Sequence, residues 1–386
     1  MKNDPKARPR VVYWNNIPSP YMVERFNAVA RRGNLDLEAW FGARTEPDRS
    51  WTVDEATWEF PHRYLPSVGA GSHRASLPTT VLTGQRPDLL VSLYATPSFL
   101  AGLRLAWSRG WRTALWVEVT FDTWVRRRVW KEALKRAVFG RVDGIITAGQ
   151  DGRAFSMRYG VPPDRIHVAR HVVDVDYFGS AAAIARLSRG EIRANLDVAG
   201  VVFLYVGRLW RGKGISTLVD AYSSIARAGP GESSLLLVGD GPETASIRRA
   251  SERDGLRVKL AGFHQKGDLP RMYAAGDVFV FPTLGDPYGL VVDEAMAAAL
   301  PIISTTAAGE IGERVIGGVN GYLVPPGDPE ALAGAMRRLA SDPALRTRMG
   351  ARSAEMIAAY TPDHWARAFE DAVKQILSSP SVGSTS

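Results

Sequence analysis

The chain has 386 residues, no cysteine, 45% hydrophobic residues and a formal net charge of +8. The lack of cysteine excludes disulfides, thiolate metal sites and cysteine nucleophiles, while length and composition favour a globular protein of two domains. The positive charge fits phosphorylated ligands, an anionic membrane surface or nucleic acid, and does not choose among them.

The N-terminal sequence, MKNDPKARPRVVYWNN, has charges and prolines where a signal peptide would have an apolar segment. The chain also lacks the run of about 18 apolar residues that a membrane-spanning helix requires. We therefore expect a soluble cytoplasmic protein.

The first half of the chain alternates short apolar runs with helical patterns. A strand is expected at 10–14 and a helix at 21–31, and further apolar runs follow at 35–41, 89–93, 114–119, 144–148 and 166–169. This alternation predicts a parallel sheet with crossover helices, in an N-terminal Rossmann-like domain over residues 1–178. The irregular segment 44–71 either shapes a binding pocket or is a packed surface loop, and both interpretations stay open.

The second half repeats the alternation, with apolar runs at 201–206, 235–239, 258–261, 278–281 and 302–305. We expect a linker and lead-in helix at 179–200, a second Rossmann-like domain over 201–360, helical sequence at 361–378 and a disordered tail at 379–386. The predicted fold class is α/β, with two Rossmann-like domains facing a central cleft. Ligands of such sheets bind at the carboxyl ends of the strands.

The stretch 277–301 (DVFVFPTLGDPYGLVVDEAMAAALP) combines a buried strand, a loop and a helix start. The helix is expected to begin near Leu290, and its free amides and positive dipole end favour phosphate. Asp286 lies in the loop and Glu294 follows eight positions later in the helix. Backbone amides can bind phosphate and carboxylates can bind hydroxyl groups, so this combination indicates a nucleotide-linked ligand.

The stretch FLYVGRLWRGKG places Arg208 and Lys213 just after the first strand of the second domain. Nearby glycines allow close approach to a ligand, and two cations five positions apart suit a diphosphate. The stretch is not a Walker loop, because the Gly-Lys-Ser/Thr ending is missing. The alternative is a solvated basic turn without a ligand.

Six stretches occur in this order: VGRLWRGKG, LLLVGDGPE, VKLAGF, DLPRMYAAGDVFVFPT, DPYGLVVDEAMAAALP and NGYLVPPGD. Together they resemble the retaining glycosyltransferases of family 4, which have the GT-B fold. The resemblance covers the second domain and is specific for the family but not for the substrate. It is weaker in the first domain. It also implies that the 361–378 helix crosses back to the first domain.

The resemblance implies a set of donor-binding residues: Arg208, Lys213, Gly289, Leu290, Val291 and Glu294. Within this set the two cations hold the donor diphosphate, the three backbone amides meet phosphate, and the glutamate binds the ribose hydroxyls. Asp286 addresses a hydroxyl of the transferred sugar and is assigned as catalytic. The family usually has glutamate at this position, so the identity of the sugar stays open.

The first domain departs from the family at two places. A histidine usually follows the fourth strand, whereas this chain has Glu118. Glu118 is either a catalytic residue near the reacting carbon or a structural residue at a strand end. Arg170, His171 and Asp174 stand where the family has Asn-Gly-Val-Asp, and we expect His171 to be a hinge or core histidine.

Cleavage of the bond between an anomeric carbon and a diphosphate leaves negative charge on the diphosphate and positive charge on the sugar. The cations and helix amides can stabilise that negative charge, so we expect no metal and no cofactor beyond the nucleotide-sugar co-substrate. The Asp174-Val175-Asp176 motif is expected to be structural. Ala299 replaces a family glycine at a position expected to affect packing.

Residues 124–141 (WVRRRVWKEALKRAVFGR) form a basic, aromatic helical pattern. By resemblance, this face could dock on anionic lipid at the inner face of the membrane. The alternative is a solvated helix that packs Val129, Leu134 and Val138 inward.

These features predict a metal-independent, retaining glycosyltransferase that uses a UDP- or GDP-sugar and a hydroxyl acceptor. A lipid-linked saccharide in cell-surface polysaccharide assembly is the expected acceptor, and a small natural product is the alternative. A GT-B epimerase or phosphorylase, and a non-catalytic sugar-nucleotide binding module, are the remaining alternatives. Nucleic-acid binding is not expected, because the sequence has no reading motif.

Overall fold

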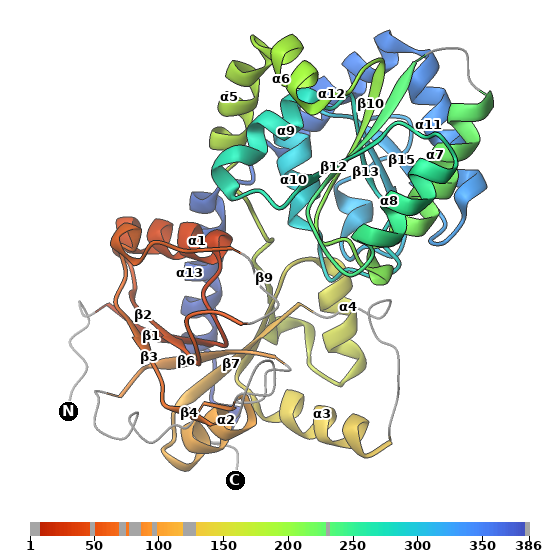
Figure 1. The fold of residues 1–386 in the computed structure, drawn as a ribbon. Helices are drawn as coiled ribbons and strands as arrows, with labels where there is room; N and C mark the ends of the chain where they lie inside the picture. The colour runs from red at the N-terminus through yellow and green to blue at the C-terminus, as the bar shows by residue number, and fades with distance from the viewer. Residues whose placement is uncertain are drawn as a thin grey trace. The chain divides into compact units, whose positions relative to one another are not determined.

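The computed structural model describes residues 8–46, 51–68, 75–76, 86–94, 99–118, 129–228 and 232–382. The chain divides into two compact units, coloured by residue number in Figure 1. Unit 1 contains the residues up to Val172 and those from Pro362 onward, and unit 2 contains Val173–Thr361.

Unit 1 is built on a parallel sheet in the order β3-β2-β1-β6-β7-β8-β9. Its strands are β1 (Arg10–Asn15), β2 (Asp36–Phe41), β3 (His62–Tyr64), β6 (Leu89–Leu93), β7 (Arg112–Val117), β8 (Gly144–Thr147) and β9 (Ile166–Val168). The inner strands are nearly continuous apolar runs, as expected for strands that are covered on both faces. A separate antiparallel pair joins β4 (Ser67–Val68) and β5 (Ala75–Ser76).

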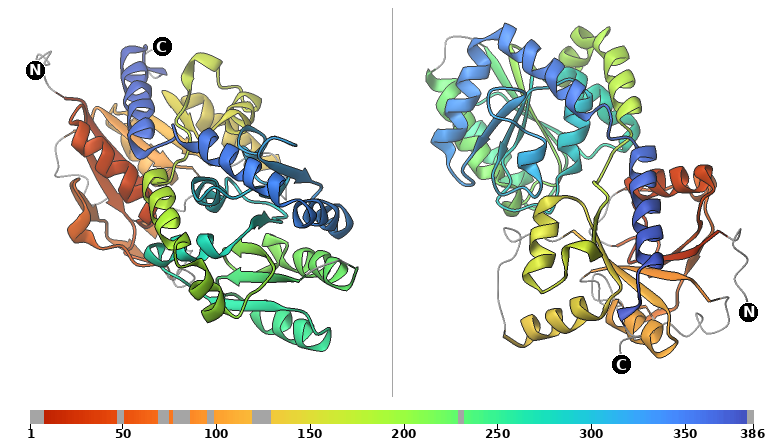
Figure 2. Two further views of the ribbon diagram at one scale, coloured as in Figure 1. Left: turned by 90° about the horizontal axis from the view of Figure 1, so that it is seen from above. Right: turned by 180° about the vertical axis from the view of Figure 1, so that it is seen from behind.

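The helices of unit 1 are α1 (Pro20–Arg32), α2 (Phe99–Ser108), α3 (Val129–Arg141), α4 (Gln150–Arg158) and α13 (Pro362–Ser378). Helix α13 packs against α1, and both views of Figure 2 show the two helices side by side. Aromatic rings fill the space between them. Trp365 stacks on Phe369 at 4.8 Å and meets Phe26 of α1 at 6.0 Å. Burial of such large rings supplies much of the apolar stabilisation of this unit.

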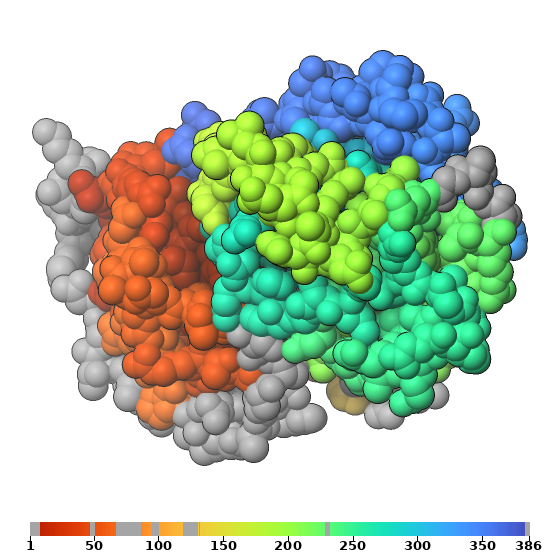
Figure 3. All heavy atoms as spheres, turned by 45° about the horizontal axis from the view of Figure 1, so that its top comes forward, coloured from red at the N-terminus to blue at the C-terminus, as the bar shows by residue number. Residues whose placement is uncertain are grey.

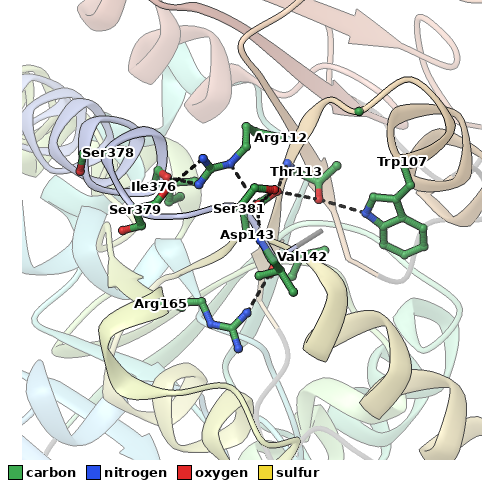
Figure 4. Close-up of polar contacts among 12 residues, drawn as sticks. Trp107, Arg112, Thr113, Val142, Asp143, Arg165, Ile376, Ser378, Ser379 and Ser381 are labelled. Atoms are coloured by element: carbon green, nitrogen blue, oxygen red, sulfur yellow. Dashed lines mark hydrogen bonds and ion pairs between the residues drawn. The ribbon is translucent and has the colours of Figure 1, made fainter. Parts of the chain in front are cut away.

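Asp143 holds the end of α13 against the sheet (Figure 4). Its carboxylate accepts from the Thr113 amide at 2.8 Å and from the Ser381 hydroxyl at 2.9 Å, and it pairs with Arg112 at 3.0 Å. Arg112 in turn donates to the carbonyl of Ile376, a favourable contact because the last carbonyls of a helix lack partners within it. Ser379, Ser381 and Val382, from the segment expected to be a disordered tail, thus form hydrogen bonds within unit 1, and residues 383–386 lie outside the described residues.

Unit 2 has a parallel sheet in the order β12-β11-β10-β13-β14-β15. Its strands are β10 (Val201–Val206), β11 (Ser233–Val238), β12 (Val258–Gly262), β13 (Val278–Phe281), β14 (Ile302–Thr305) and β15 (Gly321–Val324). Its helices are α5 (Val175–Arg186), α6 (Arg189–Leu196), α7 (Ile215–Ala228), α8 (Thr244–Arg253), α9 (Leu269–Ala275), α10 (Leu290–Ala297), α11 (Pro329–Ser341) and α12 (Pro343–Ile357). The predicted fold class, α/β with two Rossmann-like domains, is confirmed by the two sheets.

The segment 179–200, expected to be a linker and lead-in helix, lies within unit 2 and is mostly helical. Helix α5 packs on α9, and the yellow-green surface of α5 and α6 adjoins the teal surface of unit 2 in Figure 3. Arg189 and Arg193 of α6 pair with the two oxygens of Asp277 at 2.7 and 2.6 Å. The arginines of this segment therefore anchor α6 to the start of β13.

Each sheet has one point where the strand order reverses. This switch point lies between β1 and β6 in unit 1, and between β10 and β13 in unit 2. Loops that leave the carboxyl ends of such neighbouring strands diverge, which is why ligands of doubly wound sheets bind there. In unit 2 these loops are 207–214 and 282–289, and most of the predicted donor-binding residues lie on them or directly after them.

Candidate functional site

Close backbone packing defines the floor of the predicted donor site. Gly239 follows β11 with φ +136°, and a Cβ atom there would lie 1.9 Å from the carbonyl oxygen of Gly207, which follows β10. Only glycine fits this approach. The loop after β10 also meets the loop after β13, because the Leu284 amide donates to the Gly212 carbonyl at 3.0 Å.

Lys213 and Asp286 form an ion pair across these two loops. The Lys213 ammonium also lies 5.7 Å from the centre of the Phe281 ring. Asp286 is 8% exposed, and its other carboxylate oxygen accepts from the Tyr288 amide at 2.9 Å. The structure therefore brings together the cation predicted for the diphosphate and the carboxylate predicted for the sugar.

Helix α10 begins directly after this carboxylate. Gly289 caps the helix in the left-handed region, with φ +76°, and a Cβ atom there would lie 2.6 Å from the Phe281 ring. Because glycine has no side chain, it cannot cap the first amides of the helix. Gly289, Leu290 and Val291 are half-buried, so the amide end of α10 reaches the surface of the site loops. Such an end favours an anion.

Glu294 lies in the second turn of α10 and is 0% exposed. The hydroxyl of Tyr273, from α9, donates to its carboxylate at 2.6 Å. Burial lowers the pKa of Lys266, and the charge of Glu294 acts in the opposite direction on that pKa. Tyr273 was missed in the sequence, although it stands in the DLPRMYAAGD stretch, because its position indicates only an apolar helix face.

A buried arginine fixes the loop that leads into α10. Arg314 and Asp293 form an ion pair at 3.0 Å, and both side chains are 0% exposed. The Arg314 guanidinium also donates to the carbonyls of Tyr288 and Gly289, the latter at 3.1 Å. It lies 4.0 Å from the centre of the Tyr288 ring. No sequence signal identified this residue, since neither neighbouring motif nor periodicity marks a buried arginine.

Arg208, the other predicted diphosphate ligand, is exposed in the loop after β10. The buried Tyr205 hydroxyl donates to its carbonyl at 3.0 Å, which holds the loop backbone against the sheet. Arg208 and Lys213 both lie in the loop that follows β10, where the sequence placed them.

Unit 1 has a polar cluster of its own at the carboxyl end of β7. Glu118 follows that strand, and its Oε1 accepts from Trp116 Nε1 at 2.6 Å and lies 3.1 Å from His171 Nε2. Burial acts to raise the pKa of Glu118, but its contacts with His171, Arg25 and Trp116 outweigh burial and lower the pKa to about 2. The side chain is 37% exposed, so a charged carboxylate reaches the surface here.

His171 was expected to be a hinge or core histidine, and its side chain is indeed buried. The sequence did not indicate that it contacts Glu118. Its Nδ1 lies 2.6 Å from a guanidinium nitrogen of Arg25 of α1, and its ring meets Trp116 at 5.3 Å. Arg170, beside it, is also buried.

Asp174 caps helix α5 by accepting from the Tyr177 amide at 3.0 Å, so it has a structural task in the Asp174-Val175-Asp176 motif. Within the described ranges, no group of three or more His, Asp or Glu side chains is arranged to hold a metal ion. In those same ranges, no helix is long and apolar enough to cross a membrane.

The basic segment 124–141 is described only from residue 129, as helix α3. Residues 124–128 lie outside the described residues; they include Arg126, Arg127 and Arg128, three of the six basic residues expected to meet lipid, the others being Lys131, Lys135 and Arg136. Val138 packs inward, but Trp130 is 59% and Leu134 is 41% exposed. The solvated-helix interpretation is therefore wrong about Leu134, whose side chain is exposed, and correct about Val138, which is buried.

Residues 200–342, which include the loops 207–214 and 282–289, match the family model described as glycosyl transferases group 1. An alpha-D-kanosaminyltransferase of Streptomyces kanamyceticus is 30% identical over 201 residues, covering 52% of this chain and 51% of that protein. The lipopolysaccharide core biosynthesis glycosyltransferase LpsE of Rhizobium meliloti is 30% identical over 212 residues, covering 54% of this chain and 58% of that protein. The chain spans about half the length of these curated relatives.

A sucrose-phosphate synthase from Thermosynechococcus elongatus superimposes with a TM-score of 0.75 at 21% identity, covering 95% of this chain and 99% of that one. The fold is GT-B. Anabaena HepE, in a complex with UDP and glucose, also superimposes with a TM-score of 0.75, at 18% identity, covering 95% of this chain and 100% of that one. These identities show the GT-B fold alone and assign no substrate to this chain.

Proposed function

We propose that this protein is a retaining, metal-independent glycosyltransferase of family 4, which moves a sugar from a UDP- or GDP-sugar to a hydroxyl acceptor. The observation that carries the proposal is the cluster of Lys213, Asp286 and the α10 amide end. This cluster lies inside the region that matches glycosyl transferases group 1. A structural neighbour bound to UDP-glucose supports the nucleotide-sugar donor.

In this proposal the donor diphosphate lies between the cations and the helix. Lys213, Arg208 and the amides that begin α10 stabilise the negative charge that forms as the anomeric carbon–oxygen bond breaks. The bonding electrons leave with the diphosphate. The acceptor oxygen then bonds to the anomeric carbon on the same face, and its proton passes to the departing phosphate. Fixed cations and amides provide this stabilisation without a metal ion.

Glu294 binds the ribose hydroxyls in this scheme, and Asp286 accepts a hydrogen bond from a hydroxyl of the transferred sugar. Asp286 already pairs with Lys213, so the sugar and the diphosphate would be bound by two side chains that contact each other. Because aspartate is one methylene shorter than glutamate, the sugar hydroxyl must approach the β13 loop more closely. We infer that this difference affects which sugar is accepted.

We propose that unit 1 contributes Glu118 to the reaction. A carboxylate whose pKa is about 2 is charged at neutral pH and is a weak base. Its proposed role is therefore electrostatic, to stabilise the positive charge that develops on the sugar ring, and not to remove the acceptor proton.

For the acceptor, we propose a lipid-linked saccharide, with the protein at the inner face of the membrane. The similarity to a lipopolysaccharide core glycosyltransferase supports this choice. So does α3, on which the apolar side chains of Trp130 and Leu134 are exposed, as are Arg136 and Arg141. A small natural-product acceptor is the second candidate, because the similar kanosaminyltransferase favours it.

The test is to incubate the full chain with a panel of UDP- and GDP-sugars and hydroxyl acceptors, with and without EDTA. We expect transfer that survives EDTA and that falls strongly in Lys213→Ala and Glu294→Gln. Arg352→Ala, an exposed arginine of α12, is the matched control. Product that forms without an acceptor would indicate an epimerase. Product that forms only with free phosphate would indicate a phosphorylase, and donor binding without turnover would indicate a binding module. No binding of any donor would contradict the proposal.

A further inference from the structure

The cluster around Glu118 joins three segments that are far apart in the sequence. Arg25 comes from α1, Glu118 from the end of β7, and His171 from the chain after β9. Arg25 is 7% and His171 is 5% exposed, whereas the Glu118 side chain is 37% exposed. The carboxylate thus faces the surface and its partners support it from within. Residues that act on a ligand require this kind of buried support.

Arg25 determines which nitrogen of the neutral His171 ring carries the proton. A guanidinium can only donate hydrogen bonds, and Arg25 Nη1 lies 2.6 Å from His171 Nδ1. Nδ1 must therefore accept, so the proton of the neutral ring is on Nε2. Two neighbouring charges act on the charged form of the ring in opposite directions: the buried Arg25 guanidinium disfavours it, and the Glu118 carboxylate, 3.1 Å from Nε2, favours it.

Arg25 is itself held in place. Its guanidinium carbon lies 5.1 Å from the centre of the Trp365 ring and 5.6 Å from the centre of the Trp116 ring. Its Nε donates to the Tyr21 carbonyl at 3.2 Å. Stacking on two indoles and a bond to its own helix limit its rotamers. The direction of its hydrogen bond to the imidazole is therefore fixed.

His171 in turn fixes the orientation of the Glu118 carboxylate. With the proton on Nε2, the ring donates to Glu118 Oε1 at 3.1 Å, and Trp116 Nε1 donates to the same oxygen at 2.6 Å. Two buried donors on one oxygen fix the orientation of the carboxylate. They also favour its charged form.

We propose that Arg25 and His171 are positioning residues: Arg25 sets His171 as the Nε2–H tautomer, and His171 orients the Glu118 carboxylate for sugar transfer. The role of Glu118 in transfer rests on the proposed function. The tautomer and the contacts rest on the geometry of unit 1 alone.

The contacts are tested first, on the full chain labelled with ¹⁵N-histidine at pH 7. The chain has 6 histidines, and loss of one signal in His171→Gln assigns the resonance. We expect a neutral ring protonated on Nε2, and loss of that preference in Arg25→Met. A ring protonated on Nδ1, or a doubly protonated ring, would overturn the proposal.

The positioning role is tested by kinetics. His171→Leu removes the donor, whereas His171→Gln places an amide N–H near the position of Nε2. We expect the leucine variant to lower kcat by roughly 10- to 100-fold at unchanged KM for the donor, the effect of losing a hydrogen bond to a charged group. The glutamine variant should recover much of this loss. His167→Gln, a change at another histidine of the same unit, should leave kcat unchanged.

A purely structural role predicts a different result. Both His171 variants would then lose thermal stability together, without a difference in kcat between them, and this outcome would overturn the proposal. If the full chain transfers no sugar from any donor, the proposed function fails, and the tautomer spectrum alone then decides whether Arg25 and His171 form the proposed contacts.

Discussion

The buried ion pair of Arg314 and Asp293 offers a prediction whose size follows from the structure. Replacing Arg314 by methionine leaves the Asp293 carboxylate without its partner at 0% exposure. Loss of one partner of a buried pair typically costs about 3–5 kcal/mol. The same change removes the donor from the carbonyls of Tyr288 and Gly289, and so loosens the start of α10. We expect both lower stability and weaker UDP binding.

A double substitution separates these two effects. Arg314→Met with Asp293→Leu replaces the pair by apolar side chains, which is often neutral for stability. We therefore expect the double variant to regain much of the lost free energy of unfolding, with an interaction energy of about 2–3 kcal/mol between the two positions. UDP binding should stay weak, because the loop carbonyls still lack their donor.

The assay is urea unfolding of the full chain, with hydrogen exchange of the peptides that cover β13 and α10 as the local probe. The matched control is Arg352→Met, which breaks an exposed pair with Glu355 at 2.7 Å and should cost less than about 0.5 kcal/mol. The reasoning is refuted if Arg314→Met costs less than about 1 kcal/mol, or if the two single effects simply add in the double variant.

Three further predictions concern stability. Ala299 has φ +54°, so Ala299→Gly should raise the free energy of unfolding by about 1 kcal/mol, and a lower urea midpoint would contradict this. Asp143→Ala removes the buried carboxylate that pairs with Arg112 and accepts from the Thr113 amide, so we expect the free energy of unfolding to fall by about 2–4 kcal/mol. Hydrogen exchange at the end of α13 should also become faster, and unchanged exchange there would contradict the role of Asp143 in holding this helix end. The pKa of Glu118 falls from an ordinary 4.5 to about 2, so the stability that it contributes is present above pH 4.5 and lost as the pH falls toward 2. The difference in stability between the unaltered protein and Glu118→Gln should shrink over this window, and a difference that is constant with pH would count against the Glu118 contacts.

The sequence predicted both sheets because buried parallel strands appear as continuous apolar runs. It did not predict β3, whose His62–Tyr64 segment is short, polar and at the sheet edge. Residues 179–200 were interpreted as a linker because alanine, glycine and arginine in a short segment indicate neither core nor strand. The role of Arg189 and Arg193 depends on Asp277, more than 80 positions away.

The same limit explains which residues of the candidate site the sequence indicated and which contacts it missed. Lys213, Asp286, Gly289 and Glu294 lie next to strand ends and a helix start, where local spacing indicates their chemistry. The contacts that hold the start of α10 and the Glu118 carboxylate are not local. Arg314 contacts Asp293 across 21 positions, and Arg25 contacts His171 across 146, so periodicity and motif spacing could not reveal either pair.

Transfer of the sugar with retained configuration is the central claim. The most direct measurement is an NMR time course of the full chain with UDP- and GDP-sugars and a hydroxyl acceptor, which follows release of the nucleoside diphosphate and the anomeric signal of the product. The account predicts release in step with a product of the same anomeric configuration as the donor, and strong loss of both signals in Lys213→Ala. A product of inverted configuration, or no release from any donor, would contradict it.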